Sequence, residues 1–286
     1  MLGTFVSIVS VSLLAMGPGD MTARAAWGML TALVPALLMN VCIVGINQVF
    51  DVAIDKVNKP YLPLASGEFS MRTGVAVVCA TGAAALALGF AAGSPPLMAT
   101  LAGSLALGVA YSTDLPGLRW KQHPLAAAAC ILAVRAVMVQ LGFYAHMKLA
   151  LGAPSAVLAL SRPLLFAVAF MLAFSAVIAL FKDIPDVKGD RQEGVRTLSV
   201  RVGIPRVFWA CIGLLEAAYL GAICMGLASQ VWWSRAATVC LHAAMGAALF
   251  RRARATDLTS SAAIMRCYMF IWKLFYAEYL LIPLLR

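Results

Sequence analysis

Long apolar runs alternate with short polar connections along almost the whole chain. Residues 25–50 contain no charged side chain, and neither do residues 73–113, which are broken only by Gly93-Ser94-Pro95-Pro96. A transmembrane helix needs about 20 mostly apolar residues, so these runs predict helices that cross a bilayer. The pattern predicts an all-α, polytopic membrane protein of about nine transmembrane helices around a central cavity, expected as a single domain over residues 1–286. The expected spans are residues 2–16, 27–50, 74–92, 96–112, 124–144, 163–181, 207–228, 232–250 and 267–285.

Composition supports this interpretation and limits the partners. Of the 286 residues, 63% are hydrophobic and only 12% are charged, with a mean hydropathy of +0.90. A soluble domain would carry about a quarter charged residues. The net charge of +10 raises the possibility of nucleic acid. However, most lysines and arginines lie in connections that nine spans place on one side of the membrane, and the positive-inside rule assigns that side to the cytosol or stroma. The charge therefore follows topology, and we expect membrane lipid around the chain, no nucleic acid and no obligate protein partner. The basic connections are residues 51–73, 113–123, 182–206 and 251–266.

The cysteines and the first span add little chemistry. All seven cysteines fall inside expected spans, without the spacing of a disulfide framework or a metal site, so we interpret them as small packing residues. The first span is too short for the ~30 Å hydrocarbon core at 1.5 Å per residue. No transit segment is visible at the start of the sequence.

Two groups of carboxylates lie on the basic side. Asn47, Asp51 and Asp55 are four residues apart, so on a helix they share one face. Asp186 and Asp190 repeat this spacing, and Asp183 lies one turn before Asp186. Both groups follow the end of an apolar run, where a helix C-terminus disfavours negative charge. Two facing ladders of this kind would repel each other unless they shared a cation.

The ligand types favour Mg²⁺. This ion takes oxygen ligands, keeps several waters and binds through a few carboxylates together with substrate phosphates. Nearby basic side chains are suited to the remaining phosphate oxygens. The alternative is that these acids and bases only solvate loops. The candidate phosphate-binding residues are Lys59, Arg119, Lys121 and Lys182.

These motifs resemble a known family. N-x-x-x-D-x-x-x-D at 47–55 and D-x-x-x-D at 186–190 are similar to the acidic motifs of the UbiA superfamily of intramembrane prenyltransferases. Five segments resemble its plant and algal homogentisate prenyltransferases, and the resemblance covers nearly the whole chain. In that family the first helix begins with an Arg-Pro-containing stretch, whereas this chain starts at Met1-Leu2-Gly3, as though just downstream. The segments are VGINQVFDVAIDKVNKPYLPLASGE (44–68), LRWK (118–121), ILAVRAVMVQLGFYAH (131–146), FSAVIALFKDIPDVKGD (174–190) and YMFIWKLFYAEYLLIP (268–283).

The resemblance implies an activity. It implies Mg²⁺-dependent transfer of a C20 prenyl group, phytyl, from its diphosphate to homogentisate with loss of CO₂, as in tocopherol synthesis. A geranylgeranyl donor, or another plant phenolic acceptor, remains open. The implied location is a plastid membrane with the active side facing the stroma. The implied catalytic residues are Asp51, Asp55, Asp186 and Asp190, and the implied metal ligands are these four together with Asn47 and Asp183.

Arg135 and the last span are the other candidates. An arginine inside a span costs about 2.5 kcal/mol or more, so Arg135 is expected to face a cavity or a partner. It would hold the acceptor carboxylate or the diphosphate, or else pair with Glu216 or Glu278 inside the protein. Trp272, Phe275 and Tyr276 lie in the last span, where aromatic faces would stabilise an allylic cation. The alternative for these rings is packing or an interfacial belt.

The connection at residues 111–121 carries a turn and two basic side chains. Residues 111–121 contain a Pro116-Gly117 turn followed by Arg119 and Lys121, and we interpret this segment as a lid over the diphosphate, with an ordinary loop as the alternative.

A membrane transporter also has buried ionisable residues, but these tend to lie at mid-membrane in paired repeats. Here the acids gather at one face, which favours an enzyme.

Overall fold

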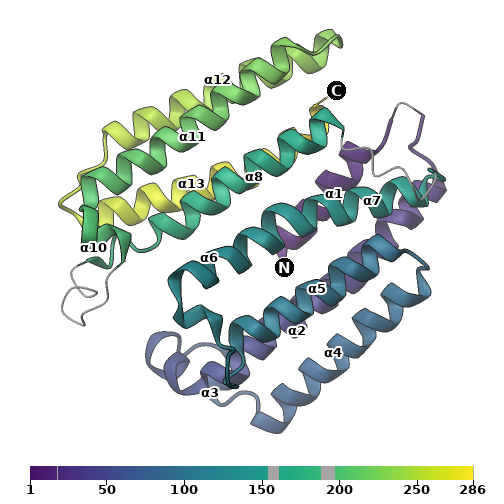
Figure 1. Ribbon diagram of the computed structural model, residues 1–286, viewed down its shortest axis with the longest axis vertical. Coiled ribbons are helices and arrows are strands. Elements are labelled where there is room, and N and C mark those ends of the chain that lie inside the picture. Colours follow the sequence, from purple (N-terminus) through teal and green to yellow (C-terminus); the bar gives the residue numbers. More distant parts are fainter. Residues whose placement is uncertain (18, 154–160, 188–196, 286) are drawn as a thin grey trace. The chain divides into compact units, whose positions relative to one another are not determined.

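Every regular element of the described chain is a helix. The computed structural model describes residues 1–17, 19–153, 161–187 and 197–285 (Figure 1). The elements are α1 (Leu2–Ala15), α2 (Ala23–Asn58), α3 (Pro63–Ser66), α4 (Met71–Ala91), α5 (Pro95–Ser112), η1 (Trp120–Gln122), α6 (Pro124–Leu132), η2 (Ala133–Met138), α7 (Val139–Ala150), α8 (Arg162–Phe181), α10 (Leu198–Val202), α11 (Ile204–Leu227), α12 (Trp232–Arg254), α13 (Ser261–Leu281) and η3 (Ile282–Leu284). The chain divides into two compact units, Met1–Val134 with Met138–Ala159, and Arg135–Val137 with Leu160–Arg286.

The membrane character is supported, but the count of nine spans is not confirmed. Among the residues that the structure describes, six helical segments are long and apolar enough to cross a membrane. Helices also form at the other three expected places. Of these, α1 has only 14 residues, α5 begins with two prolines, and α12 carries Arg235 and His242. The six segments are Ala23–Asn58, Met71–Ala91, Leu125–Ala150, Arg162–Phe181, Ile204–Leu227 and Ser261–Leu284.

Helix α2 is much longer than the span expected from its apolar run. It begins at a Thr22 cap, whose hydroxyl accepts from the Ala25 amide at 3.3 Å, and it continues for 36 residues. At 1.5 Å per residue this is about 54 Å, well beyond a ~30 Å hydrocarbon core. Asn47 and Asp51 therefore lie within the helix. The first ladder was expected on one helix, at its C-terminal end, and all three of its residues lie on α2, with Asp55 in the last turn.

Small residues set the helix packing of the first unit. A Cβ atom on Gly82 of α4 would lie 2.9 Å from the Cys42 sulfur of α2, and one on Gly142 of α7 would collide with the Thr100 side chain of α5. Such close approaches are typical of membrane helices, because small residues let the backbones meet. The same packing brings the polar end of α2 next to the end of α5.

The fifth expected span is one helix with an irregular centre. Instead of ending near residue 144, the helix continues to Ala150, and Ala133–Met138 have π-helical geometry. Arg135 lies in this π segment. Single π turns often mark functional positions in helices, because the extra residue changes where the following side chains point.

The second unit has an aromatic core with a buried ionisable pair. Phe170 and Phe174 of α8 pack edge-on against Tyr219 of α11. Beside them, His242 Nε2 of α12 lies 3.2 Å from Glu278 Oε2 of α13, with these side chains 2% and 1% exposed. Glu278 was one of the two carboxylates considered as partners of Arg135, and the structure gives it a histidine.

The cysteines are all free thiols, in agreement with the absence of a disulfide framework. Four are buried and fit the packing role expected for all seven. The other three are exposed on the helix surfaces, so for them the packing interpretation was wrong. The buried thiols are Cys42, Cys130, Cys211 and Cys267, and the exposed ones are Cys79, Cys224 and Cys240.

Candidate functional site

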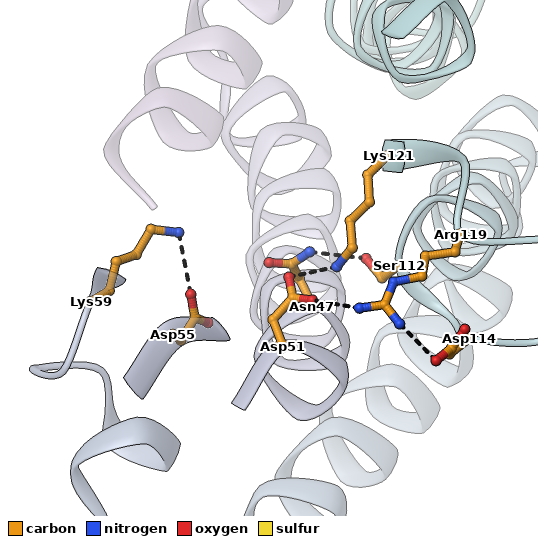
Figure 2. Close-up of polar contacts among 8 residues, drawn as sticks. All are labelled: Asn47, Asp51, Asp55, Lys59, Ser112, Asp114, Arg119 and Lys121. Atoms are coloured by element: carbon orange, nitrogen blue, oxygen red, sulfur yellow. Dashed lines mark hydrogen bonds and ion pairs between the residues drawn. The ribbon is translucent and has the colours of Figure 1, made fainter. Parts of the chain in front are cut away.

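The first acidic ladder lies on α2 beside the loop that follows α5 (Figure 2). The Asn47 amide donates from Nδ2 to the Ser112 hydroxyl at 3.3 Å, which leaves its oxygen as the atom that Asn47 can offer to a metal. One turn later, Asp51 faces Arg119 and Lys121 of the loop. The ladder and two of the predicted phosphate-binding residues thus form one cluster within the first unit.

Asp51 is the centre of this cluster. Lys121 Nζ lies 2.5 Å from Asp51 Oδ2, and an Arg119 terminal nitrogen lies 3.6 Å from Asp51 Oδ1. The three side chains are only 13% to 16% exposed. Arg119 also contacts Asp114 at 2.7 Å, and the Asp114 side chain is 67% exposed. Arg119 is therefore held between an enclosed carboxylate and an exposed one.

The loop presents Arg119 in an uncommon backbone conformation. Its φ is 60°, the only positive value among the non-glycine residues that the structure describes, and Gly117 nearby has φ 78°. A left-handed arginine costs free energy and persists only where its surroundings fix it. Two contacts do so here: the Trp120 indole nitrogen donates to the Gly117 carbonyl at 2.9 Å, and Asp114 holds the guanidinium. The lid interpretation of this segment stays a prediction.

Two buried polar atoms in the cluster have no hydrogen-bond partner. One is Asp51 Oδ1, whose contact with Arg119 is an ion pair at 3.6 Å, and the other is Arg119 Nε. Buried polar groups normally find partners, so an exception calls for an explanation. A carboxylate oxygen suits Mg²⁺, and a guanidinium N–H suits a phosphate oxygen. The residues present therefore fit a magnesium–diphosphate group.

Asp55 lies apart from this cluster. Its side chain is 5% exposed, and Lys59 Nζ lies 3.6 Å from Asp55 Oδ1, four residues further along the chain. Lys59 itself is 53% exposed. In Figure 2 the Asp55–Lys59 pair points to a different side from Asn47 and Asp51. Lys59, which is predicted to bind phosphate, thus contacts a predicted metal ligand, and its phosphate-binding role stays a prediction.

The second acidic motif begins after α8, not on it. Helix α8 ends at Phe181 with Lys182 as its C-cap, so Asp183 and Asp186 follow the helix. The helical four-residue spacing expected for Asp186 and Asp190 is therefore not a continuation of this span, and Asp190 lies outside the described residues. In the described part of the chain, no group of three or more His, Cys, Asp or Glu side chains is placed to hold a metal. The complete metal site remains a prediction.

Arg135 lies over aromatic rings of the last helix. Its guanidinium carbon is 5.2 Å from the centre of the Trp272 ring and 5.6 Å from that of Phe275. Tyr276 packs on Trp272 with ring centres 5.9 Å apart. The predicted acceptor residue and the three predicted ring residues therefore form one cluster in the second unit.

Known proteins identify the family of the chain. The model of the UbiA prenyltransferase family matches residues 4–274. The chain belongs to this family. It is therefore a prenyltransferase, and its resemblance to the homogentisate branch is also supported.

Relatives and solved structures extend the match. The chain is 57% identical over 286 residues to a probable homogentisate phytyltransferase 1, chloroplastic, of Oryza sativa subsp. japonica, covering 100% of this chain and 70% of the relative. It is 51% identical over 283 residues to a homogentisate geranylgeranyltransferase of Triticum aestivum, covering 98% and 69%. A structure of a UbiA homolog from Archaeoglobus fulgidus bound to DMAPP and Mg²⁺ has a TM-score of 0.61 at 18% identity, covering 99% of this chain and 95% of that chain. The last likeness concerns the fold alone.

The sequence did not single out two residues of the first cluster. Asp114 anchors Arg119 at 2.7 Å, and Ser112 orients the Asn47 amide. A usable signal existed for Asp114, because it lies on the same short loop as Arg119, on the other side of the Pro116-Gly117 turn. The sequence held no such signal for Ser112, because its contact with Asn47 depends on how α2 and α5 pack.

Proposed function

We propose that this family member transfers a phytyl group from phytyl diphosphate to homogentisate, with loss of CO₂, in a Mg²⁺-dependent step of tocopherol synthesis in a plastid membrane. The observation that carries the proposal is the pair of buried atoms in the first cluster, Asp51 Oδ1 and Arg119 Nε, which lack hydrogen-bond partners. One suits a metal and the other a phosphate oxygen. The relatives named above for homogentisate support the acceptor.

The chain's own residues divide into a metal-binding set and a phosphate-binding set. Asn47, Asp51 and Asp55 would hold Mg²⁺ together with the second motif, Asp183, Asp186 and Asp190. Mg²⁺, when bound, neutralises charge that develops on the departing diphosphate. Arg119 and Lys121 would contact the phosphate oxygens, because both already lie beside Asp51 on the enclosed side of the loop. Lys182, at the end of α8, and Lys59 are further candidates for this set.

The reaction balances without an added oxidant. The C–O bond to the diphosphate breaks, and the allylic carbon bonds to a ring carbon of homogentisate. The ring loses one proton, and the methyl group that remains after CO₂ leaves gains one. Charges fixed in place before the reaction lower its barrier most when they face the departing diphosphate. We expect the membrane side that carries the acidic ladder to face the stroma.

The cluster around Arg135 would bind homogentisate, the acceptor of the prenyl group. A guanidinium binds a carboxylate through two parallel hydrogen bonds, and homogentisate carries a carboxylate. Trp272 and Phe275 keep this cation on their faces. With Tyr276, the same rings would stabilise an allylic cation close by. A structural role for Arg135 is the alternative, and an Arg135→Lys variant separates the two roles.

The second candidate donor is geranylgeranyl diphosphate. A relative with this named activity is 51% identical to the chain, close to the 57% of the phytyl relative. The two tails differ only in double bonds, and an apolar cavity discriminates weakly between such tails. The proposal therefore places phytyl first and geranylgeranyl second.

One experiment tests the reaction and the donor together. Purified protein is incubated with Mg²⁺ and homogentisate carrying a labelled carboxyl group, with either phytyl or geranylgeranyl diphosphate. The proposal expects a prenylated methylquinol by mass spectrometry, labelled CO₂ in equal amount, and a higher kcat/KM for the phytyl donor. A reversed donor preference would support the second candidate. A product that keeps its carboxyl group, or no product with either donor, would refute the proposed acceptor chemistry.

A further inference from the structure

A groove of about 560 Å³ lies in the first unit, far along α2 from the acidic ladder. It is bounded by the start of α2, the end of α4 with the turn into α5, and the end of α7 (Figure 1). Arg24 at its edge is 23 residues before Asn47, or about 35 Å along the helix. The groove is therefore separate from the proposed catalytic cluster, and its size is that of a site for a small ligand.

The groove is polar at one end and apolar along its length. Arg24, Ser94 and His146 line the polar end, at the helix termini, while Leu30 and Val34 line the rest. The distance along α2 from Arg24 to Pro35, which also lines the groove, is about 16 Å. This matches half of a ~30 Å hydrocarbon core, which is the depth of one leaflet. The dimensions fit one lipid chain with its headgroup at the membrane face.

The polar end is built by hydrogen bonds. His146, 3% exposed, lies 2.8 Å from the Gly28 carbonyl through Nε2 and 2.8 Å from the Ser94 hydroxyl through Nδ1. Since a carbonyl only accepts, Nε2 carries a proton and donates to Gly28. This imidazole ties α7 to α2 and to the α4–α5 turn, which fixes the walls of the groove.

Arg24 supplies the charge. Among the lining residues that the structure describes, it is the only lysine, arginine, aspartate or glutamate. It is exposed in the first turn of α2, where the helix dipole adds positive potential. Asp20, the nearest acid in the sequence, does not line the groove and accepts from the Gly17 amide at 2.7 Å. The polar end therefore favours an anionic group.

We propose that this groove binds one membrane lipid with an anionic headgroup, on the membrane face opposite the acidic ladder. The headgroup contacts Arg24, and one acyl chain lies along Leu30 and Val34 toward Pro35. Trp27, 66% exposed at the groove edge, lies at the depth where tryptophan is enriched in membrane proteins. This site is independent of the prenyl-transfer proposal.

The test measures lipid binding without substrates. Protein in neutral detergent is titrated with phosphatidylglycerol or with phosphatidylcholine of the same chains, and bound lipid and thermal melting are followed by native mass spectrometry and a melting assay. Arg24→Gln removes the charge. Arg162→Gln is the matched control, because Arg162 is also exposed in the first turn of a transmembrane helix but does not line the groove. Val34→Trp fills the apolar part.

The expected result is a preference of wild-type protein for phosphatidylglycerol of about five-fold, equivalent to about 1 kcal/mol for one basic residue near a membrane surface. Arg24→Gln should lose this preference, Arg162→Gln should keep it, and Val34→Trp should weaken binding of both lipids. Equal binding of the two lipids by wild-type protein, or equal losses in the two arginine variants, would overturn the proposal. The proposal would also be overturned if glycerol phosphate alone gave the same melting shift as phosphatidylglycerol, because that result would indicate a site for free anions. Prenyl transfer at saturating substrate should be unchanged in Arg24→Gln.

Discussion

Replacing Asp51 with asparagine separates a metal-binding role from a purely structural one. The substitution keeps the shape of the side chain and removes its charge. In the structure this charge has two partners, Lys121 at 2.5 Å and Arg119 at 3.6 Å. If Asp51 only neutralises these bases, its loss should affect stability. If it also holds Mg²⁺ against the diphosphate, its loss should affect turnover far more.

Asp114→Asn is the matched control, since Asp114 contacts the same arginine at 2.7 Å. Its side chain is 67% exposed, and exposed ion pairs contribute about 0–1 kcal/mol, so turnover should fall at most about five-fold. Asp51 is 13% exposed, and losing one fixed group that stabilises transition-state charge costs about 10²- to 10³-fold in kcat. The two variants are expected to differ by at least about 20-fold.

The assay is prenyl transfer measured over a range of Mg²⁺ concentrations, with thermal melting of each variant alongside. Asp51→Asn should also raise the Mg²⁺ concentration that gives half of the maximal rate, which a lost ion pair alone would not do. Asp114→Asn should leave that concentration unchanged. Near-normal turnover in Asp51→Asn, or equal losses in the two variants, would refute the metal role of Asp51.

Three further predictions concern other parts of the chain. Arg135→Lys should raise the KM for homogentisate about 10- to 150-fold and the donor KM much less, since a charge-assisted hydrogen bond contributes about 1.5–3 kcal/mol; a rise in donor KM instead would assign Arg135 to the diphosphate. His242→Leu should destabilise the second unit by about 1–3 kcal/mol, because the buried carboxyl group of Glu278 loses its hydrogen-bond partner, and an unchanged melting temperature would contradict this. Gly142→Ala should lower the melting temperature, because the new methyl group would clash with the Thr100 side chain of α5. Gly213→Ala has nothing within 4 Å of its new Cβ atom, so it should leave the melting temperature equal or higher. Equal effects of the two variants would contradict the packing argument.

The sequence predicted the helices better than their ends. Apolar runs located helices at all nine expected places, because a long apolar run has few alternatives to a helix in a bilayer. They did not predict that α2 reaches Asn58, since the apolar run stops near Phe50 while the residues beyond it still form helix readily. They also did not predict the π segment at Arg135, which no hydropathy pattern marks.

The chemistry of the site was predictable by residue type but not by pairing. Four-residue spacing placed Asn47 and Asp51 on one face, because that spacing is a property of a single helix. The contact of Asp51 with Lys121 joins residues 70 positions apart and depends on the packing of α2 against the loop after α5. The His242–Glu278 pair likewise joins two residues 36 positions apart, on two different helices. Such contacts follow from tertiary packing, which spacing along the chain does not determine.

The most direct test of the central claim, that this acidic and basic cluster works with Mg²⁺ on a prenyl diphosphate, is turnover after complete chelation of divalent ions. Purified protein with homogentisate and phytyl diphosphate is assayed in excess chelator, and Mg²⁺ is then added back above the chelator concentration. The account predicts no product under chelation and full recovery of the rate on adding Mg²⁺. Turnover that continues unchanged in the chelator would contradict it.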